Sequence, residues 1–180
     1  MPLLNSVTTP YAEALLQVVN ENDQTEQIVE EVKQLLNLIN DVPELGKTLS
    51  SPVLEKETKK KIIVEIFSEK INSSLLNFLK LLADRQRIEI VTSILDRFLE
   101  IYRENSNIAL ATVTSAVELT DDQKGLITKK IINIAGTEKL ELVTKIDPSL
   151  IGGFVASVGS KVIDASLASQ IRKLGLSLSK

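Results

Sequence analysis

The sequence contains neither cysteine nor histidine in its 180 residues. Without cysteine, the chain can form neither a disulfide framework nor a thiolate site, whichever redox compartment holds it. Without histidine, it lacks the side chain that most often serves as general base and as transition-metal ligand. A zinc site would need carboxylates alone, unlike the usual zinc sites of proteins. The composition therefore disfavours an enzyme, and we expect no catalytic residue, no cofactor and no metal ion.

Long apolar runs and basic stripes are missing as well. No window approaches the roughly 20 consecutive apolar residues of a membrane-spanning helix, and the first residues resemble neither a signal peptide nor a transit peptide. The formal charge of −3 divides into −5 for residues 1–105 (12 basic, 17 acidic) and +2 for residues 106–180 (9 basic, 7 acidic). Neither half has the basic stripe that binds nucleic-acid phosphates. We expect no nucleic-acid binding, no direct membrane insertion, and membrane association only through a partner.

Helical periodicity dominates residues 1–105. Aromatic residues make up only 3% of the chain and apolar residues 43%, so its cores must consist of Leu, Ile and Val. Thr9-Pro10 is typical of a helix start, because a capping hydroxyl precedes a proline at the first helical position. Helical runs are expected near residues 11–20, 25–39, 43–51, 55–69, 73–84 and 88–104. Such runs with short connections predict an antiparallel bundle of about six helices.

The pattern then changes to that of a small α/β domain, residues 106–180, so that the whole chain is of the α+β class. Residues 108–117 are uncharged and rich in β-branched side chains, as in a buried strand. Thr120 and Gln123 form a capping box that opens a helix, and Gly136 suits its C-terminal cap. Further strands are expected at 139–146, 151–158 and 161–164, followed by a helix at 166–178.

The most distinctive segment is residues 145–167, Lys-Ile-Asp-Pro-Ser-Leu-Ile-Gly-Gly-Phe-Val-Ala-Ser-Val-Gly-Ser-Lys-Val-Ile-Asp-Ala-Ser-Leu. An Asp-Pro turn leads into an apolar run with a glycine pair, and Gly-Ser then fits a type II′ hairpin turn. Together with Thr-Pro-Tyr-Ala-Glu-Ala at 9–14 and Leu-Leu-Ala-Asp-Arg-Gln-Arg-Ile at 81–88, this segment resembles the delta subunit of F-type ATP synthases. That family includes the mitochondrial oligomycin-sensitivity-conferring protein, and the likeness is closer to bacterial, cyanobacterial and plastid members. The residues of this fold signature are Asp147, Gly152, Gly153, Gly159 and Asp164.

The resemblance implies a function as well as a fold. It identifies residues 1–105 as the part that binds the catalytic head, and residues 106–180 as the part that contacts the b-type peripheral stalk. The protein would be a non-catalytic stator connector, present as one copy in a hetero-oligomer, through which proton flow is coupled to ATP synthesis. It would be a peripheral membrane protein, held by its complex on the cytoplasmic or stromal side of a thylakoid or bacterial plasma membrane.

Two helical runs, 11–20 and 75–84, are almost wholly apolar. In each run, the polar residues share a stripe of only about 60° at 100° per residue. Such a helix either is central in its bundle or buries a second face on another protein, and periodicity leaves both explanations open. The resemblance implies that the first and fifth helices receive the N-terminal helices of alpha subunits of the head. The candidate residues of this groove are Tyr11, Ala14, Leu15, Val18, Asn77, Phe78 and Leu81.

Gly152 and Gly153 admit another interpretation, as a phosphate cradle. No GxGxxG or GxxxxGKS/T frame surrounds them, and glycine in a strand more often permits close packing or a bulge. Asp147 and Asp164 could pair as carboxylates, but a turn and a helix cap explain them. The Lys59-Lys60-Lys61 cluster lies among glutamates, which favours a solvated face. The rival functions are thus an unrelated helical adaptor and, less favoured, a small-ligand enzyme built on the two glycines and two aspartates.

Overall fold

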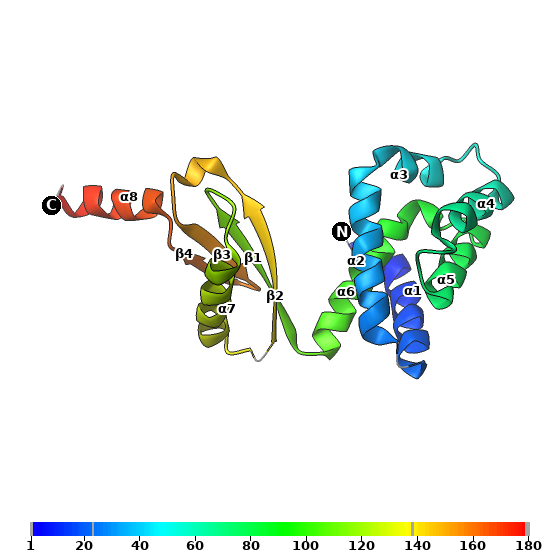
Figure 1. Ribbon diagram of the computed structural model, residues 1–180, viewed down its shortest axis with the longest axis horizontal. Coiled ribbons are helices and arrows are strands. Elements are labelled where there is room, and N and C mark those ends of the chain that lie inside the picture. The colour runs from blue at the N-terminus through cyan, green and yellow to red at the C-terminus, as the bar shows by residue number, and fades with distance from the viewer. Residues whose placement is uncertain (1, 23, 138, 179–180) are drawn as a thin grey trace. The chain divides into compact units, whose positions relative to one another are not determined.

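The computed structural model describes residues 2–22, 24–137 and 139–178. Its contacts divide the chain into two compact units, Met1–Tyr102 and Arg103–Lys180. The first unit is built of helices, and the second combines helices with a four-stranded mixed sheet (Figure 1). The chain is therefore of the α+β class, and its two units divide close to the position near 105 where the sequence pattern changes.

The helices of the first unit follow the apolar periodicity of the sequence. Their bounds are α1 (Pro2–Glu21), α2 (Thr25–Asp41), α3 (Pro43–Ser50), α4 (Lys56–Phe67), α5 (Ser73–Asp84), η1 (Ile88–Ile90) and α6 (Val91–Asn105). α5 has the predicted bounds, and the Asn72 side chain caps it by accepting a hydrogen bond from the Ser74 N–H at 2.8 Å. The run predicted at 88–104 starts as the short 3₁₀ helix η1 before α6 continues it.

α1 begins earlier than predicted, so the interpretation of Thr9-Pro10 as a helix start is wrong. The helix extends from Pro2, and Pro10 lies inside it. Pro10 is exposed, and it lacks the N–H that the helix would otherwise offer to the Ser6 carbonyl. The Thr9 hydroxyl accepts a hydrogen bond from Arg97 Nε of α6 at 3.3 Å instead of capping a helix. A contact distant in sequence therefore supports α1 at the position where the local signal predicts its start.

One hydrophobic core holds the helical unit together. Its largest fully buried side chains include Phe98, Ile28, Ile63, Leu75 and Leu82. α5 is one of the central helices, because five of its residues are buried: Leu75, Phe78, Leu79, Leu82 and Ala83. At about 25 cal/mol per Å² of apolar area removed from water, this burial is the main stabilising contribution to the unit.

The second unit is a mixed sheet with helices. Its elements are β1 (Ile108–Ser115), α7 (Asp121–Ala135), β2 (Lys139–Ile146), η2 (Pro148–Leu150), β3 (Phe154–Val158), β4 (Lys161–Asp164) and α8 (Leu167–Leu178). The strands lie in the order β2-β1-β3-β4, with β1 parallel to β2 and the other neighbours antiparallel. A parallel pair needs a crossover connection, which α7 supplies (Figure 1).

Local signals in this half of the sequence are confirmed. The Thr120 hydroxyl accepts a hydrogen bond from the Gln123 N–H, and the Gln123 side chain accepts one from the Thr120 N–H, so the capping box is formed. Gly136 ends α7 in the left-handed conformation, with φ 73°. Gly159 has φ 54° in the two-residue loop between β3 and β4. A positive φ at the first loop residue is what the predicted type II′ turn requires.

The strand predicted at 151–158 begins only at Phe154, which is a correction to the sequence interpretation. The short helix η2 turns the backbone first, and the Ile151 N–H donates a hydrogen bond to the Pro148 carbonyl at 3.3 Å. Ile151 and Gly153 then adopt positive φ values of 64° and 76°. Because strands have negative φ, this segment cannot join the sheet. The glycine pair therefore lies before the strand and not within it.

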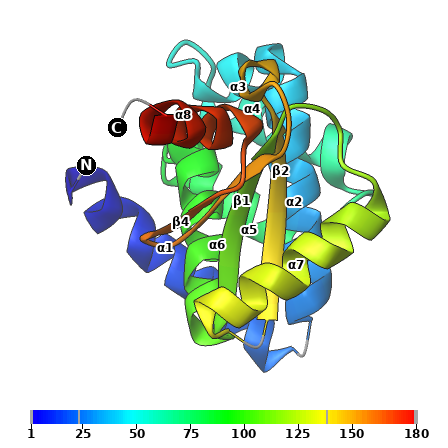
Figure 2. The same ribbon diagram turned by 90° about the vertical axis from the view of Figure 1, so that its left-hand side faces the viewer.

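α7 packs against one face of the sheet (Figure 2). The register places Ala111, Val113 and Ala156 on this face, since Val113 is paired with Ala156. Ile127 and Ile131 of α7 complete a small core there. The other face carries the alternating residues, and the exposed apolar side chains among them include Leu110, Val143 and Val162.

Candidate functional site

The predicted groove residues of the helical unit separate into two groups. Leu15 and Phe78 are 2% and 8% exposed and belong to the core, so they can form at most the floor of a groove. Tyr11 is half-buried and packs against the same core. The exposed candidates are Ala14, Val18, Asn77 and Leu81. Burial thus places Leu15 and Phe78 in the core, and it leaves the exposed candidates accessible to a partner.

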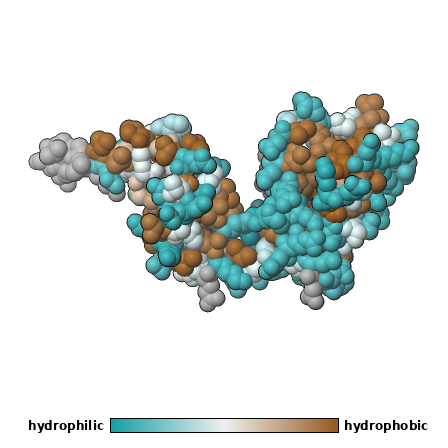
Figure 3. Space-filling model, in the orientation of Figure 1, coloured by the Kyte–Doolittle hydropathy of each residue, from teal (hydrophilic) through white to brown (hydrophobic). Residues whose placement is uncertain are grey.

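The exposed candidates form what we call the α1–α5 strip: Ala14, Val18, Asn77 and Leu81. Each pair is spaced by four residues on its helix, so its members lie along one helix edge. Val18 and Leu81 are each 45% exposed, and α1 packs against α5. Figure 3 shows hydrophobic residues reaching the surface of the helical unit among hydrophilic ones. Exposed apolar side chains such as Val18 and Leu81 suit the apolar face of a guest helix.

The lysine cluster at 59–61 is partly engaged within the helical unit. Lys60 forms an ion pair with Asp84 of α5 and a longer one, of 3.5 Å, with Glu57. The hydrogen bond to Asp84 raises the pKa of Lys60 above its ordinary value of 10.5, against the opposing effect of desolvation. Lys60 therefore stays charged and joins α4 to α5. This is a structural role on a solvated face, in keeping with the sequence interpretation.

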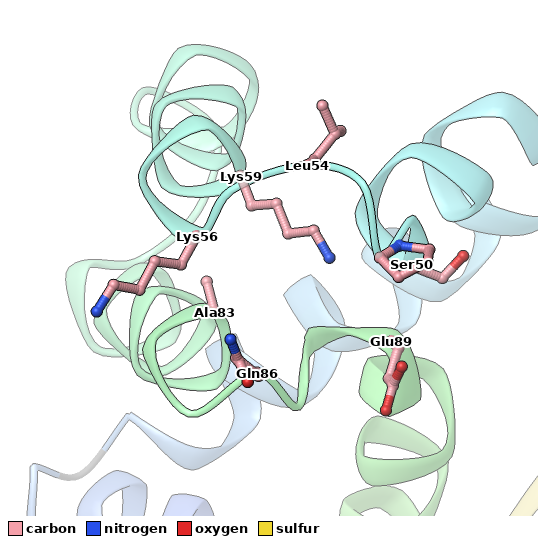
Figure 4. Close-up of a pocket in the computed structure, with 8 residues that line it drawn as sticks. Ser50, Leu54, Lys56, Lys59, Ala83, Gln86 and Glu89 are labelled. Atoms are coloured by element: carbon pink, nitrogen blue, oxygen red, sulfur yellow. The ribbon is translucent and has the colours of Figure 1, made fainter.

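A polar hollow of about 260 Å³ lies among α3, α4 and the end of α5 (Figure 4). Its lining includes Ser50, Leu54, Lys59, Gln86 and Glu89. Lys59 extends into the enclosed space, whereas Lys56 extends away from it (Figure 4). The ionisable side chains of this lining are Lys56, Lys59 and Glu89.

The glycine pair lies where neighbouring groups pack closely. A Cβ at Gly152 would lie 2.6 Å from Leu167 Cδ1, and a Cβ at Gly153 would collide with the Ala165 carbonyl oxygen. The Gly152 N–H also donates to the Leu150 carbonyl at 2.7 Å, so it is not free for an anion. Gly153 therefore shows the close approach of backbones that was one of the two structural explanations open from the sequence, whereas Gly152 meets the Leu167 side chain.

The two aspartates beside this pair support local backbone structure. Asp147 Oδ1 accepts a hydrogen bond from the Ser149 N–H at 2.9 Å, and its hydrogen bonds with Ser149 lower the pKa of Asp147 below its ordinary value of 3.8. Asp164 Oδ1 accepts from the Ser166 N–H at 2.9 Å and from the Ser166 hydroxyl at 2.7 Å. Ser166 Oγ in turn accepts from the Ser169 N–H at 3.2 Å. Ser166 therefore caps α8, and Asp164 holds that cap in place.

Among the residues that the structure describes, no group of three or more His, Cys, Asp and Glu side chains is placed to hold a metal ion. No helix that these residues form is both long enough and apolar enough to span a membrane.

Sequence reasoning missed an apolar hollow in the second unit, which we call the α7 groove. It measures about 420 Å³ and is bounded by the β1–α7 connection, α7 and residues 151–153. Val117, Leu126 and Ile151 line it and are 69%, 69% and 70% exposed. A signal was available in the apolar Val117 and Leu119 before the capping box, where a solvated loop would carry polar residues.

Comparison with known proteins agrees with this two-unit architecture. The family model described as the ATP synthase delta (OSCP) subunit matches residues 7–178. ATP synthase subunit delta of Prochlorococcus marinus subsp. pastoris is 93% identical over 180 residues, which are 100% of both chains. The same subunit of Prochlorococcus marinus strain MIT 9303 is 56% identical and is covered over 99% of its length, with 100% of this chain matched.

A solved structure shares the fold over both units. One chain of the cryo-EM structure of the Toxoplasma gondii mitochondrial ATP synthase hexamer has a TM-score of 0.72 to this protein at 19% identity. The similarity covers 96% of this chain and 97% of that chain. The family match and the two bacterial relatives each extend over nearly the whole sequence. This protein therefore belongs to the ATP synthase delta (OSCP) subunit family.

Proposed function

We propose that this protein is the non-catalytic stator connector of an F-type ATP synthase. It links the alpha/beta catalytic head to the b-type peripheral stalk, so that the head does not turn with the rotor and proton flow is coupled to ATP synthesis. The family match over residues 7–178 carries the proposal, because it includes both units. The absence of histidine and cysteine from the sequence supports a role without catalysis.

Each unit has its own role in this proposal. Residues 1–105 act as an antiparallel bundle of about six helices that binds the head, and residues 106–180 contact the stalk. The α1–α5 strip receives an N-terminal helix of an alpha subunit. The exposure of Val18 and Leu81 supports this role, because a helix edge that faces only water is normally polar.

Tight binding is the physical requirement of a connector, since a stator that dissociates loses coupling. A dissociation constant near 1 nM corresponds to about 12 kcal/mol. Association itself costs roughly 4–15 kcal/mol in lost freedom, so apolar burial at about 25 cal/mol per Å² has to exceed that cost. Surface ion pairs contribute little by comparison. The apolar side chains of the strip are therefore expected to supply more of the affinity than its charged neighbours.

The same proposal implies the copy number of the protein and the way in which it associates with the membrane. It is a peripheral subunit, present as one copy in the complex, and it reaches the membrane through its partners. The two relatives compared above match along the whole chain and come from Prochlorococcus marinus, which favours the cytoplasmic side of a thylakoid membrane.

Calorimetric titration of the full chain with a peptide of the N-terminal residues of the cognate alpha subunit tests head binding. We expect saturable 1:1 binding with a negative heat-capacity change, the mark of apolar burial. Ala14→Asp places a charge in the strip and should weaken binding by about tenfold or more. Gln34→Asp, at an exposed position of α2, is the matched control and should bind normally. The proposal fails if the wild-type chain shows no saturable binding, or if Ala14→Asp binds normally with an intact circular-dichroism spectrum.

A further inference from the structure

The sheet of the second unit has one long open edge, which β2 forms. Because the strand order is β2-β1-β3-β4, β2 has β1 on one side and no strand on the other in the part of the chain that the structure describes. β2 spans eight residues, against four in β4 at the opposite edge, and it contains no proline. Its side chains Val143 and Ile146 are 40% and 59% exposed. A strand edge of this length is able to pair with a further strand.

The hydrogen bonds to β1 show which backbone groups of β2 point outward. Ser115 of β1 is aligned with Ile146, and its carbonyl accepts a hydrogen bond from the Asp147 N–H at 2.8 Å. In a parallel pair, a residue bonds to the two neighbours of the residue aligned with it. The odd-numbered residues of β2 therefore direct their N–H and C=O groups toward β1. The even-numbered residues direct theirs to the open side: Leu140, Leu142, Thr144 and Ile146.

Pairing of β2 with β2 of a second copy is limited to a few registers. In an antiparallel pair, outward-directed groups bond to outward-directed groups. Even-numbered residues must therefore face even-numbered residues, and odd-numbered residues must face odd-numbered ones. The two-fold axis of such a dimer then passes through one position of the strand, which faces itself in the second copy.

The charges of β2 favour the register with the axis at Val143. In this register, Glu141 faces Lys145 of the second copy, and Lys139 faces Asp147 of the second copy. The two-fold axis forms each of these opposite-charge pairs twice. Glu141 also pairs with Arg103 within the chain, and an ionised carboxylate has acceptor sites for both cations. Opposite charges that face each other across two strands stabilise the pairing.

Shifting the axis by one position brings like charges together. With the axis at Leu142, Lys139 faces Lys145 of the second copy. With the axis at Thr144, Glu141 faces the second copy's Asp147. Like charges directly opposite destabilise a sheet, so both neighbouring registers are disfavoured.

The apolar side chains agree with the same register. With the axis at Val143, Val143 faces itself, and Leu140 faces Ile146 of the second copy. Leu140 belongs to the sheet face that α7 covers, so the exposed Ile146 is brought next to an apolar neighbour there. Cross-strand pairs of β-branched and aliphatic side chains stabilise a sheet.

We infer that the open edge of β2 binds a second copy of this chain, with the two β2 strands antiparallel about Val143 and the two sheets joined into one. The occupant is a second copy because the strand is complementary to itself in charge and in its outward hydrogen-bonding groups. The proposed function gives the assembled complex one copy, so this dimer belongs to the free chain and dissociates on assembly. The inference depends on none of the partners proposed above.

Sedimentation equilibrium of the full chain between about 10 µM and 1 mM tests self-association over the range of a small, weak interface. We expect a reversible monomer–dimer equilibrium. Thr144→Pro removes one outward N–H and none of the hydrogen bonds to β1, as edge strands tolerate. It should weaken the dimer by about tenfold or more. Its circular-dichroism spectrum and its binding of the alpha-subunit peptide should match those of the wild type.

Lys145→Glu tests the register without any change of the backbone. It places a glutamate opposite Glu141 twice in each dimer, so association should weaken by about tenfold or more. Lys129→Glu is the matched control, because it makes the same change of charge at an exposed position of α7, and it should associate as the wild type does. If Thr144→Pro alters the circular-dichroism spectrum, this pair of variants decides the question.

The absence of cysteine from the chain permits a direct test of the axis. Residues that face each other without hydrogen bonds across antiparallel strands have Cα atoms about 4.5 Å apart, a separation that a disulfide can bridge. Val143→Cys should therefore form a disulfide-linked dimer under mild oxidation. Val162→Cys, exposed on β4 at the other edge of the sheet, is the control and should cross-link far more slowly.

Three results would overturn the inference. The first is a chain that stays monomeric up to the highest concentration. The second is a dimer that forms equally well in Thr144→Pro and in Lys145→Glu. The third is a Val143→Cys variant that cross-links no faster than Val162→Cys, because the two copies would then meet through another surface.

Discussion

Gly153 has little tolerance for any side chain, and this can be tested at the residue scale. Its φ is 76°, and a Cβ there would meet the Ala165 carbonyl oxygen. Gly153→Ala should lower the free energy of unfolding by about 1–3 kcal/mol. Gly125→Ala in α7 is the matched control, because a Cβ there meets nothing within 4 Å, and it should raise stability by about 0.5–1 kcal/mol. Urea denaturation measures the free energy of unfolding of both variants. If Gly153→Ala is as stable as Gly125→Ala, the packing role of Gly153 is refuted.

The contribution of the Asp147 carboxylate to stability should depend on pH. Its hydrogen bonds with Ser149 lower its folded-state pKa below 3.8. A depressed pKa stabilises the fold above the unfolded value, and this contribution is lost as pH falls through the folded pKa. Asp147→Ala should therefore lower the thermal midpoint at neutral pH and converge with the wild type at pH values below the folded pKa. A constant difference across this range would show that the carboxylate charge is not the cause.

Among the secondary-structure elements, α5 carries two neighbouring leucines, Leu81 and Leu82, that differ in burial. Leu82 is fully buried, whereas Leu81 is 45% exposed in the α1–α5 strip. Leu82→Ala should cost about 2–5 kcal/mol of stability through cavity formation. Leu81→Ala should change stability by less than about 0.5 kcal/mol but weaken binding of the alpha-subunit peptide. Denaturation and calorimetric titration of both variants separate core from partner face, and loss of stability in Leu81→Ala would place that residue in the core.

At the scale of the whole molecule, each unit has a hydrophobic core of its own. Two cores predict two unfolding transitions in scanning calorimetry. The alpha-subunit peptide, at about 100 times its dissociation constant, should stabilise only the transition of the helical unit, by about 2.7 kcal/mol. The stalk subunit should shift only the other transition. A single transition that either partner shifts as a whole would show that the two units unfold as one.

The parts of the fold that could be predicted are those governed by local chemistry. The bounds of α5 follow from apolar period and an asparagine cap, and the start of α7 follows from Thr120 and Gln123. The left-handed cap at Gly136 and the positive φ of Gly159 in the β3–β4 loop are equally local, because each depends on the backbone freedom of one residue. In these cases the determining groups lie within a few positions of one another, so the sequence order already brings them together.

The candidate site was predictable only in part. An apolar helix such as α1 or α5 does not indicate which side is core, so Leu15 and Phe78 were grouped with Val18 and Leu81 although their exposures differ. The α7 groove was missed because its residues come from three separate segments. Such a surface exists only once the chain has folded, since sequence distance does not show which side chains meet.

The amino-acid order alone indicates the class of the chain, the kinds of elements, the position near which its two units divide, and its family. Packing in three dimensions is needed to show that α1 continues through Pro10, that Ile151 and the glycine pair lie outside the sheet, and which leucines stay accessible. The two groups differ in the distance along the chain over which the deciding interactions act. Period, caps and turn residues act through neighbouring groups, whereas burial and backbone strain are set by packing between segments far apart in the chain.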